Sequence, residues 1–274
     1  MSDRIPKRII QTAKNANLPL RERAAACNLK LLNPDFEYLF FDDQQVEEFV
    51  DSCFPHCRPV FESFPFRIQR YDFFRYLAVY HYGGFYFDLD VFLASGLSDL
   101  LESGCVFPFE GLTFSHYLRN KYRMDWQIGN YAFGATERHP FLHAVINNCV
   151  RAQEDPKWVQ PMMKGVPPLS RSEFFILNTT GPGLLSRTLA EHPALAEGVT
   201  VLFPEDVCDV RLWNRFGDLG VHLMDGSWRT KQGFLRRRLA QRWEVWKMQK
   251  LLKESRAAGK TRTHVLITRS REDS

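Results

Sequence analysis

Residues 71–93 contain an apolar segment of helix length, two consecutive glycines and a short aromatic run that ends in two aspartates. Gly83 and Gly84 permit backbone angles that other residues resist, so they predict a sharp turn from the helix into a buried strand. Asp88 and Asp90 follow the aromatic run, and both point the same way only if the strand ends there. The segment therefore predicts a helix, a turn and a strand that delivers two carboxylates into a loop.

Two carboxylates at the end of an apolar strand suit a hard divalent cation. Charge next to residues such as Phe87 and Phe92 is costly unless it is paired or bound to a metal. Oxygen ligands of this kind hold Mg²⁺ or Mn²⁺ together with the phosphates of a substrate. Asp72 and Arg75, three residues apart on one helical face, add a charged pair upstream. A turn carboxylate and a buried ion pair are the alternative, purely structural interpretations of these residues.

The motifs of this segment resemble those of glycosyltransferase family 32, whose sugar-binding region carries S-D-x-x-R, G-G-x-Y and D-x-D in that order. The corresponding stretches are Tyr71-Asp72-Phe73-Phe74-Arg75, Gly83-Gly84-Phe85-Tyr86 and Asp88-Leu89-Asp90. Tyr71 departs from the serine of the family. The family includes yeast mannosyltransferases and bacterial capsule and lipopolysaccharide enzymes, and it is similar to the catalytic domain of the large clostridial glucosylating toxins.

Weaker segments elsewhere follow the order of the same family. They are 5–12, 33–38, 130–140, 180–183 and the set His222, Ser227 and Trp228. Ala13 stands where the family has a tryptophan, which in the toxins stacks on the uracil base, so the base of the donor stays open. The resemblance predicts a catalytic domain over 1–228, followed by a basic amphipathic tail over 229–274.

Alternating helix and strand signals predict an α/β domain with a mostly parallel sheet. The expected strands are 8–11, 37–41, 85–88, 104–107, 131–135 and 200–202, and the expected helices are 20–31, 44–51, 66–82, 140–154 and 181–190. Asp43 is expected to cap the helix over 44–51. The resemblance implies the GT-A fold, a nucleotide-sugar-binding α/β domain. Ligands of such sheets lie beyond the carboxyl ends of the strands, where Asp88 and Asp90 fall.

The resemblance implies a metal-dependent, retaining glycosyltransferase that moves a hexose from a UDP- or GDP-sugar to an acceptor hydroxyl. The expected acceptor is a glycan of a lipopolysaccharide, capsule or glycolipid, including a lipid-linked glycan. Catalysis is assigned to Asp72, Arg75, Asp88 and Asp90, and Mn²⁺ or Mg²⁺ to Asp88, Asp90 and His222. The residues assigned to donor binding are Gln11, Thr12, Asp72, Arg75, Gly84, Tyr86, Asp88, Asn130, Ser227 and Trp228.

Two other classes of protein use similar features. A phosphatase of the haloacid dehalogenase type also has Asp-X-Asp after an apolar strand, but it requires Thr or Val where Phe92 stands, and its motif lies near the N-terminus. A non-catalytic carbohydrate- or membrane-binding protein is the other alternative, and the presence of both aspartates and of His222 argues against it. Stabilisation by a nucleoside diphosphate together with Mn²⁺ would distinguish the transferase from both.

The composition is typical of a globular domain, with 45% hydrophobic and 25% charged residues, which excludes wholesale disorder. No apolar run approaches the length of a membrane span, and the first ten residues lack a signal-peptide core, so a cytoplasmic location is expected. Cys53 and Cys57 flank His56 without a second ligand pair, which disfavours a zinc site.

The chain becomes strongly basic after Trp228. Residues 229–262 contain twelve Lys or Arg against two acids. Apolar residues recur there at helical spacing, namely Leu235, Leu239, Trp243 and Trp246. This pattern favours peripheral contact with an anionic membrane at its cytoplasmic face. A terminal helix packed on the catalytic domain is the alternative, and nucleic acid is disfavoured because no binding motif appears.

Overall fold

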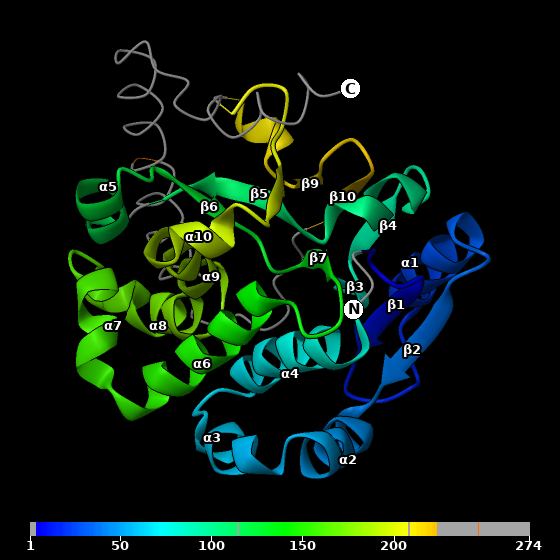
Figure 1. Ribbon diagram of the computed structural model, residues 1–274, viewed down its shortest axis with the longest axis horizontal. Helices are drawn as coiled ribbons and strands as arrows, with labels where there is room; N and C mark the ends of the chain where they lie inside the picture. The colour runs from blue at the N-terminus through cyan, green and yellow to red at the C-terminus, as the bar shows by residue number, and fades with distance from the viewer. Residues whose placement is uncertain (1–3, 114, 208, 224–245, 247–274) are drawn as a thin grey trace.

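The computed structural model describes residues 4–113, 115–207 and 209–223, together with residue 246. In these parts of the chain, helices pack around a seven-stranded sheet, and a smaller three-stranded sheet lies beside it (Figure 1). Among the described residues, no helix combines the length and the apolar character that crossing a membrane requires. Ser227, Trp228, the predicted boundary at 228 and the basic tail, apart from Trp246, lie outside the described residues.

The larger sheet has the strand order β2-β1-β3-β7-β5-β6, with β8 paired to β5. Its strands are β1 (Arg8–Thr12), β2 (Glu37–Phe41), β3 (Gly84–Phe87), β5 (Cys105–Leu112), β6 (Trp126–Ile128), β7 (Ala132–Ala135) and β8 (Thr200–Leu202). The smaller sheet has the order β4-β10-β9. Its strands are β4 (Val91–Leu93), β9 (Arg215–Phe216) and β10 (Gly220–His222).

The helices alternate with the strands along the chain. They are α1 (Leu20–Leu32), α2 (Asp43–Cys53), α3 (Arg58–Ser63), α4 (Arg67–Tyr82), α5 (His116–Tyr122), α6 (Pro140–Glu154), α7 (Pro156–Met163), α8 (Arg171–Thr179), α9 (Pro182–Glu191) and α10 (Pro193–Ala196). Short 3₁₀ turns are η1 (Pro55–Cys57), η2 (Ser98–Ser103), η3 (Pro168–Ser170) and η4 (Val210–Leu212). The expected α/β class is therefore confirmed.

The larger sheet is mixed. β1 is parallel to β2 and β3, and β8 is parallel to β5, whereas β7 lies antiparallel between β3 and β5. β6 is also antiparallel to β5, with Leu112 opposite Trp126, so β6 and β7 form two pieces of one arm along β5. Residues 129–131 interrupt this arm. Five of the seven strands point the same way, as expected of a mostly parallel sheet, and β6 and β7 run against them, so that three of the six pairings are antiparallel.

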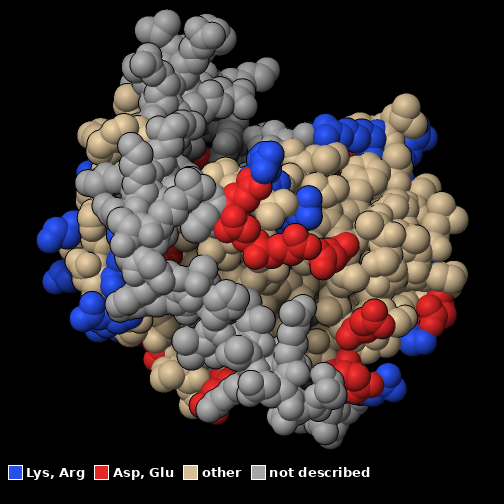
Figure 2. All heavy atoms as spheres, turned by 90° about the horizontal axis from the view of Figure 1, so that it is seen from above, with Lys and Arg blue, Asp and Glu red and all other residues tan. Residues whose placement is uncertain are grey.

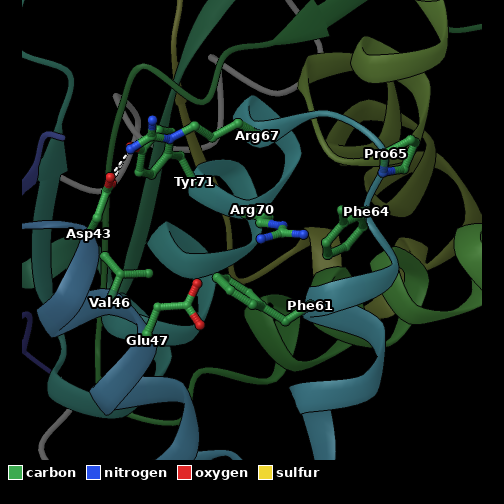
Figure 3. A pocket seen from close by; sticks show the side chains of 9 residues that line it. All are labelled: Asp43, Val46, Glu47, Phe61, Phe64, Pro65, Arg67, Arg70 and Tyr71. Carbon is green, nitrogen blue, oxygen red and sulfur yellow. Dashed lines mark hydrogen bonds and ion pairs between the residues drawn. The ribbon is translucent and has the colours of Figure 1, made fainter.

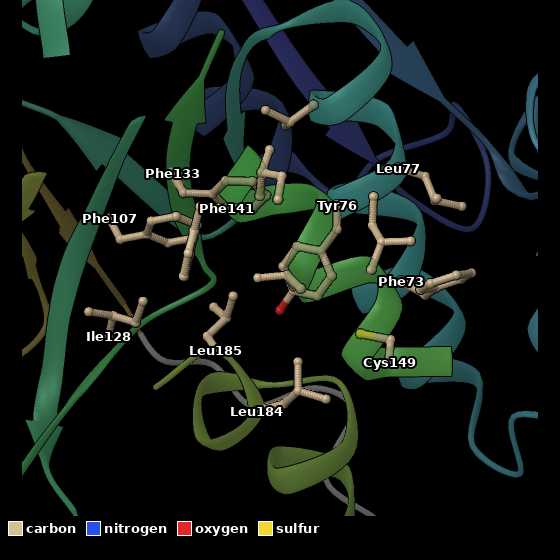
Figure 4. Close-up of a cluster of buried hydrophobic side chains, with 14 of the residues drawn as sticks. Phe73, Tyr76, Leu77, Phe107, Ile128, Phe133, Phe141, Cys149, Leu184 and Leu185 are labelled. Atoms are coloured by element: carbon tan, nitrogen blue, oxygen red, sulfur yellow. The ribbon is translucent and has the colours of Figure 1, made fainter. Parts of the chain in front are cut away.

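Helix α4 passes through the middle of the main hydrophobic cluster. Figure 4 shows Phe73, Tyr76 and Leu77 of this helix among the side chains that cover one face of the sheet. The rings of Phe107 and Phe133 stack there with centroids 5.0 Å apart. Burying each such side chain contributes about 1.5–3 kcal/mol. Because α4 is buried from Asp72 to Val79, the charged residues on it are held below the surface.

The glycine pair makes the turn that the sequence predicts. Gly83 caps α4 at φ 62°, and its N–H donates to the Val79 carbonyl at 2.9 Å. Gly84 has φ 100°, and a Cβ there would lie 2.6 Å from the Arg8 Cβ. A larger residue would therefore both strain the backbone and separate β3 from β1. Gly84 begins β3, at the opposite end of the strand from Asp88.

The expected cap of α2 is wrong by one residue. Asp42, not Asp43, caps the helix, because its carboxylate accepts a hydrogen bond from the Gln45 backbone N–H at 2.9 Å and the Asp42 N–H donates to Gln45 Oε1 at 3.0 Å. Asp43 is the first helical residue, and its carboxylate pairs with Arg67. The capping box therefore moves the start of the helix one residue towards the N-terminus.

Candidate functional site

Asp88, Asp90 and His222 converge just beyond the carboxyl end of β3. Asp88 follows β3, and Asp90 immediately precedes β4. β10 pairs antiparallel with β4 so that His222 lies opposite Val91, which places its Nε2 3.2 Å from Asp90 Oδ1. One potential ligand atom from each of the three residues lies within 4.8 Å of the others. The structure thus brings together the three residues that the sequence assigned to a metal.

The chemistry of this cluster fits a divalent cation. Two carboxylates and one imidazole nitrogen are ligands that Mn²⁺ accepts, and Mg²⁺ also favours the carboxylates. Burial raises the pKa of Asp88, against the opposing charge of Arg75. Burial lowers the pKa of His222, but its hydrogen bond to Asp90 and the charges of both aspartates outweigh this, so its pKa lies above the usual value. The site therefore concentrates negative charge in partly buried surroundings.

Arg75 links helix α4 to the end of β3. Its guanidinium lies 3.1 Å from Asp88 Oδ1 and 3.2 Å from Asp72 Oδ1, and it donates to the Asn130 carbonyl at 2.7 Å. It also lies over the Tyr86 ring, 4.6 Å from the centroid. Burial lowers the pKa of Arg75, but the neighbouring carboxylates outweigh it, so the group stays charged. Its Nε is buried and has no hydrogen-bond partner in the structure.

Asp72 is held by Asn130 and Thr180 in addition to Arg75. Its Oδ1 accepts a hydrogen bond from Asn130 Nδ2 at 3.0 Å, and its Oδ2 accepts one from the Thr180 hydroxyl at 2.9 Å. Burial raises the pKa of Asp72 to about 6. Tyr76 extends the network, because its hydroxyl donates to the Thr180 carbonyl at 2.6 Å. The roles of Thr180 and Tyr76 were not predicted, although the Thr-Gly-Pro segment of the resemblance pointed to the first.

The remaining predicted residues of the described chain lie on β1 and β3, and most of them make hydrogen bonds near the carboxyl ends of the strands. The Tyr86 hydroxyl donates to Asp88 Oδ1 at 2.9 Å. Gln11 is fully buried, and its side-chain amide lies 3.3 Å from the carbonyl that ends β3. The Thr12 hydroxyl donates at 2.8 Å to the carbonyl that ends β2. Gln11 and Thr12 therefore hold β1 to its neighbours, while Gly84 lies at the far end of β3 and packs against β1.

Sequence reasoning missed Tyr131. The ring of Tyr131 stacks on that of His222 with centroids 4.2 Å apart, and its hydroxyl donates to the Arg215 carbonyl at 2.7 Å. Its backbone carbonyl accepts from the Asp88 N–H at 2.7 Å. The interruption of the β6–β7 arm thus delivers both Asn130 and Tyr131 to the site. An aromatic residue next to Asn130 was the only signal in the sequence.

A separate cavity of about 390 Å³ lies between α2, α3 and the first turns of α4 (Figure 3). It is lined by Asp43, Val46, Glu47, Phe61, Phe64, Pro65, Arg67, Arg70 and Tyr71. The Asp43 carboxylate pairs with Arg67 and accepts a hydrogen bond from the Tyr71 hydroxyl. None of the metal-type ligands lines it, so this cavity is distinct from the carboxylate cluster.

Acidic side chains gather on one face of the molecule. Figure 2 views the molecule from above, the side on which Figure 1 places β9 and β10, and shows Asp and Glu side chains grouped near the middle of that face. Some Lys and Arg side chains lie beside this acidic group, and others lie towards the margins of the face. A local group of carboxylates of this kind attracts cations.

Comparison with known families identifies the segment that contains these carboxylates. Residues 19–107 match the family described as glycosyltransferase sugar-binding region containing DXD motif. The match includes Asp72, Arg75, Asp88 and Asp90, and it confirms the resemblance drawn from the sequence.

Curated relatives match over a larger part of the chain. Inositol phosphoceramide mannosyltransferase 2 of Schizosaccharomyces pombe is 29% identical over 74% of this chain and 53% of its own length. Inositol phosphoceramide mannosyltransferase 1 of the same yeast is 31% identical over 53% of this chain and 43% of its own length. Mannosyl phosphorylinositol ceramide synthase SUR1 of Saccharomyces cerevisiae is 29% identical over 66% of this chain and 41% of its own length. The chain thus spans about half the length, or less, of these relatives.

A solved structure described as PaToxG Glycosyltransferase aligns with a TM-score of 0.48 and 18% identity. The alignment covers 69% of this chain and 70% of that chain.

Proposed function

We propose that this chain transfers a hexose from a nucleoside diphosphate sugar to an acceptor hydroxyl, because residues 19–107 match a glycosyltransferase sugar-binding region containing a DXD motif. The observation that carries the proposal is the convergence of Asp88, Asp90 and His222 within 4.8 Å, beside the network of Asp72 and Arg75. This arrangement supports a site for a metal-bound diphosphate next to buried polar groups that can hold a sugar.

Asp88, Asp90 and His222 are the residues that would hold Mn²⁺ or Mg²⁺. When bound, such an ion neutralises negative charge on the diphosphate leaving group. His222 is oriented for this role by its stacking on Tyr131 and its contact with Asp90. The guanidinium of Arg75 contacts the carboxylate of Asp88 and holds it in place. The residues of the chain thus hold the ligands in place before the ion and the donor arrive.

Arg75 and Asp72 are proposed to bind hydroxyls of the donor sugar. The buried Nε of Arg75 lacks a partner, and leaving such a donor unsatisfied costs about 1–3 kcal/mol, which a sugar oxygen would recover. Asp72 Oδ1 already contacts both Asn130 and Arg75, whereas Oδ2 accepts one hydrogen bond, from Thr180, and keeps a second lone pair for a sugar hydroxyl. The Asn130 amide, which donates to Asp72, orients that carboxylate towards the same space.

The proposed reaction retains the anomeric configuration. The acceptor oxygen forms a bond to the anomeric carbon while the bond from that carbon to the diphosphate oxygen breaks, and its electron pair leaves with the diphosphate. The proton of the acceptor hydroxyl passes to the leaving diphosphate. The acceptor approaches on the same face as the leaving group, so no protein nucleophile is required.

The names of the relatives favour one substrate class among those expected. They describe mannosyl transfer to inositol phosphoceramide, which favours a mannosyl donor and a glycolipid acceptor over a lipopolysaccharide or capsule acceptor for this chain. The donor would then be a nucleoside diphosphate mannose. A screen of UDP- and GDP-sugars would determine whether the base of the donor is uracil or guanine.

The test is a screen of UDP- and GDP-sugars in the absence of an acceptor, in which release of the free sugar is measured. Each donor is assayed with Mn²⁺ and again after a chelator has removed the metal. We expect one donor to be hydrolysed, and the activity to disappear when the metal is removed. Asp90→Asn should abolish it, because the variant is nearly isosteric but lacks the anionic ligand. Asp99→Asn, an exposed aspartate in η2, is the matched control. A folded Asp90→Asn protein with wild-type turnover would contradict the metal assignment.

The same assay separates the two alternatives. A phosphatase of the haloacid dehalogenase type would release inorganic phosphate from a simple phosphate monoester and would need no nucleoside. A non-catalytic binding protein would turn over no donor, whichever ion is supplied.

A peripheral position on the cytoplasmic face of a membrane is the remaining part of the proposal. It is supported by the twelve Lys or Arg between 229 and 262, each of which contributes about 1 kcal/mol near an anionic surface. The full chain should float with vesicles that contain anionic lipid and should be released as salt rises, whereas a chain ending at 228 should not float. Flotation of the truncated chain would contradict this assignment.

A further inference from the structure

Glu110 brings a fourth carboxylate to the site, beside those of Asp72, Asp88 and Asp90, and neither the sequence motifs nor the metal cluster accounts for it. It lies on β5 where the pairing with β6 shifts register, between Phe109 and Gly111. Phe107 and Phe109 point into the main hydrophobic cluster, so the alternation of the strand turns Glu110 towards the opposite face. Irregularities of this kind often redirect a side chain next to an active site.

The Glu110 carboxylate lies against the interruption that delivers Asn130 and Tyr131. A Cβ added at Gly129 would meet Glu110 Oε2 at 2.4 Å and the Tyr131 ring at 2.8 Å, so both groups border the same glycine. Burial raises the pKa of the Tyr131 hydroxyl, and the charge of Glu110 raises it further, as expected for neighbours. The Tyr131 ring in turn stacks on His222 at 4.2 Å. A continuous set of contacts therefore runs from Glu110 to the metal-type cluster.

Glu110 does not belong to the set of metal-type ligands in the described residues, which consists of Asp88, Asp90 and His222. It also lies on β5, on the far side of β7 from β1, β3 and the Arg75 network. In the proposed reaction the acceptor approaches on the face of the leaving diphosphate. Tyr131, which stacks on His222, and Glu110 beside it are candidates for contact with an acceptor at this site.

We propose that Glu110 binds the acceptor, accepting hydrogen bonds from two neighbouring hydroxyls of a ring polyol such as a hexose or cyclitol. This inference rests on the proposed function. A carboxylate has two oxygens, each with two lone pairs, and suits a pair of hydroxyls on one ring. An anionic group at this position would face Glu110, Asp88 and Asp90 together, so any phosphate of the acceptor must lie farther out. Glu110 holds the ring in place and accepts no proton, because the proton of the acceptor hydroxyl leaves with the diphosphate.

The experiment measures how the wild-type protein and Glu110→Gln divide a donor between water and a soluble polyol. Methyl α-mannopyranoside and myo-inositol serve as probes, with the donor identified by the screen and with Mn²⁺ present. We expect Glu110→Gln to lower the ratio of transfer to hydrolysis about ten- to a hundredfold, because a hydrogen bond to a charged group is replaced by a weaker one. Glu102→Gln, an exposed surface glutamate paired with Arg4, should keep the wild-type ratio.

A second variant tests the same proposal in case Glu110→Gln does not fold. Gly129→Ala keeps the charge of Glu110 but fills the space beside its carboxylate, so it should lower the same ratio. An unchanged ratio in a folded Glu110→Gln protein would overturn the assignment, as would a wild-type protein that transfers to water but to neither polyol. A wild-type protein that hydrolyses no nucleoside diphosphate sugar would instead overturn the proposed function, because hydrolysis requires no acceptor.

Discussion

Arg75 contacts two carboxylates, a backbone carbonyl and an aromatic ring of the candidate site. Its guanidinium reaches Asp72, Asp88 and the Asn130 carbonyl at once, which the single ammonium of lysine cannot do. We expect Arg75→Lys to lower donor hydrolysis about ten- to a hundredfold, the cost of about one lost charged hydrogen bond. The affinity for the free nucleoside diphosphate with Mn²⁺ should fall much less, because Arg75 is assigned to the sugar. Turnover and calorimetric affinity, measured on the same preparation, check this prediction.

Arg187→Lys is the matched control for that substitution. Arg187 is also buried, pairs with Glu191 at 2.7 Å and stacks on Trp158 at 3.5 Å, but it lies on α9 outside the site. Its replacement should lower the melting temperature without a specific loss of turnover at temperatures where the protein is folded. Equal losses of turnover in the two variants would indicate that Arg75 acts through stability alone.

The sequence motifs single out residues that the structure brings close together, and their roles stay predictions. Asp72, Arg75, Asp88 and Asp90 lie in one short segment, and the structure brings them together with Asn130 and His222. Glu110 and Tyr131 could not be predicted, since their position depends on the register shift between β5 and β6. Nothing in the local pattern of residues 105–112 signals such a shift.

At the scale of elements, the turn from α4 into β3 determines where the carboxylates fall. Gly84→Ala should destabilise the protein by about 2–5 kcal/mol, because the residue would be strained at φ 100° and its Cβ would lie 2.6 Å from the Arg8 Cβ. Gly104→Ala is the control, since Gly104 also has a positive φ of 66° but nothing lies within 4 Å of an added Cβ. It should cost only about 1 kcal/mol from backbone strain. Urea unfolding of both variants measures the difference, and equal costs would contradict the close approach.

The elements that the sequence missed are mostly short. β2, β8 and α6 match the expected ranges, because each has a clear hydrophobic pattern or flanking signal. β4, β9 and β10 have two or three residues each, too few to show a period. Their pairing places His222 beside Asp90, so the most informative contact of the site depends on elements with the weakest sequence signal.

At the scale of the whole molecule, the cluster of ligands joins the two sheets. Asp88 follows β3 of the larger sheet, whereas His222 ends β10 of the smaller one. A ligand that contacts both residues must stabilise the packing of one sheet on the other. The predicted helix or membrane role of the basic tail belongs to this scale too, and it stays a prediction because those residues lie outside the described part of the chain.

Mn²⁺ and the nucleoside diphosphate should therefore raise the melting temperature together. At concentrations about a hundredfold above the dissociation constant, binding stabilises the folded state by about 2.7 kcal/mol, which for a chain of this size is roughly 5–10 °C. His222→Ala should lose most of this shift, because it removes the only ligand contributed by the smaller sheet within the described residues. His192→Ala, an exposed histidine before α10, should keep it. Differential scanning calorimetry of the three proteins checks the prediction, and a full shift in His222→Ala would show that the smaller sheet takes no part in binding.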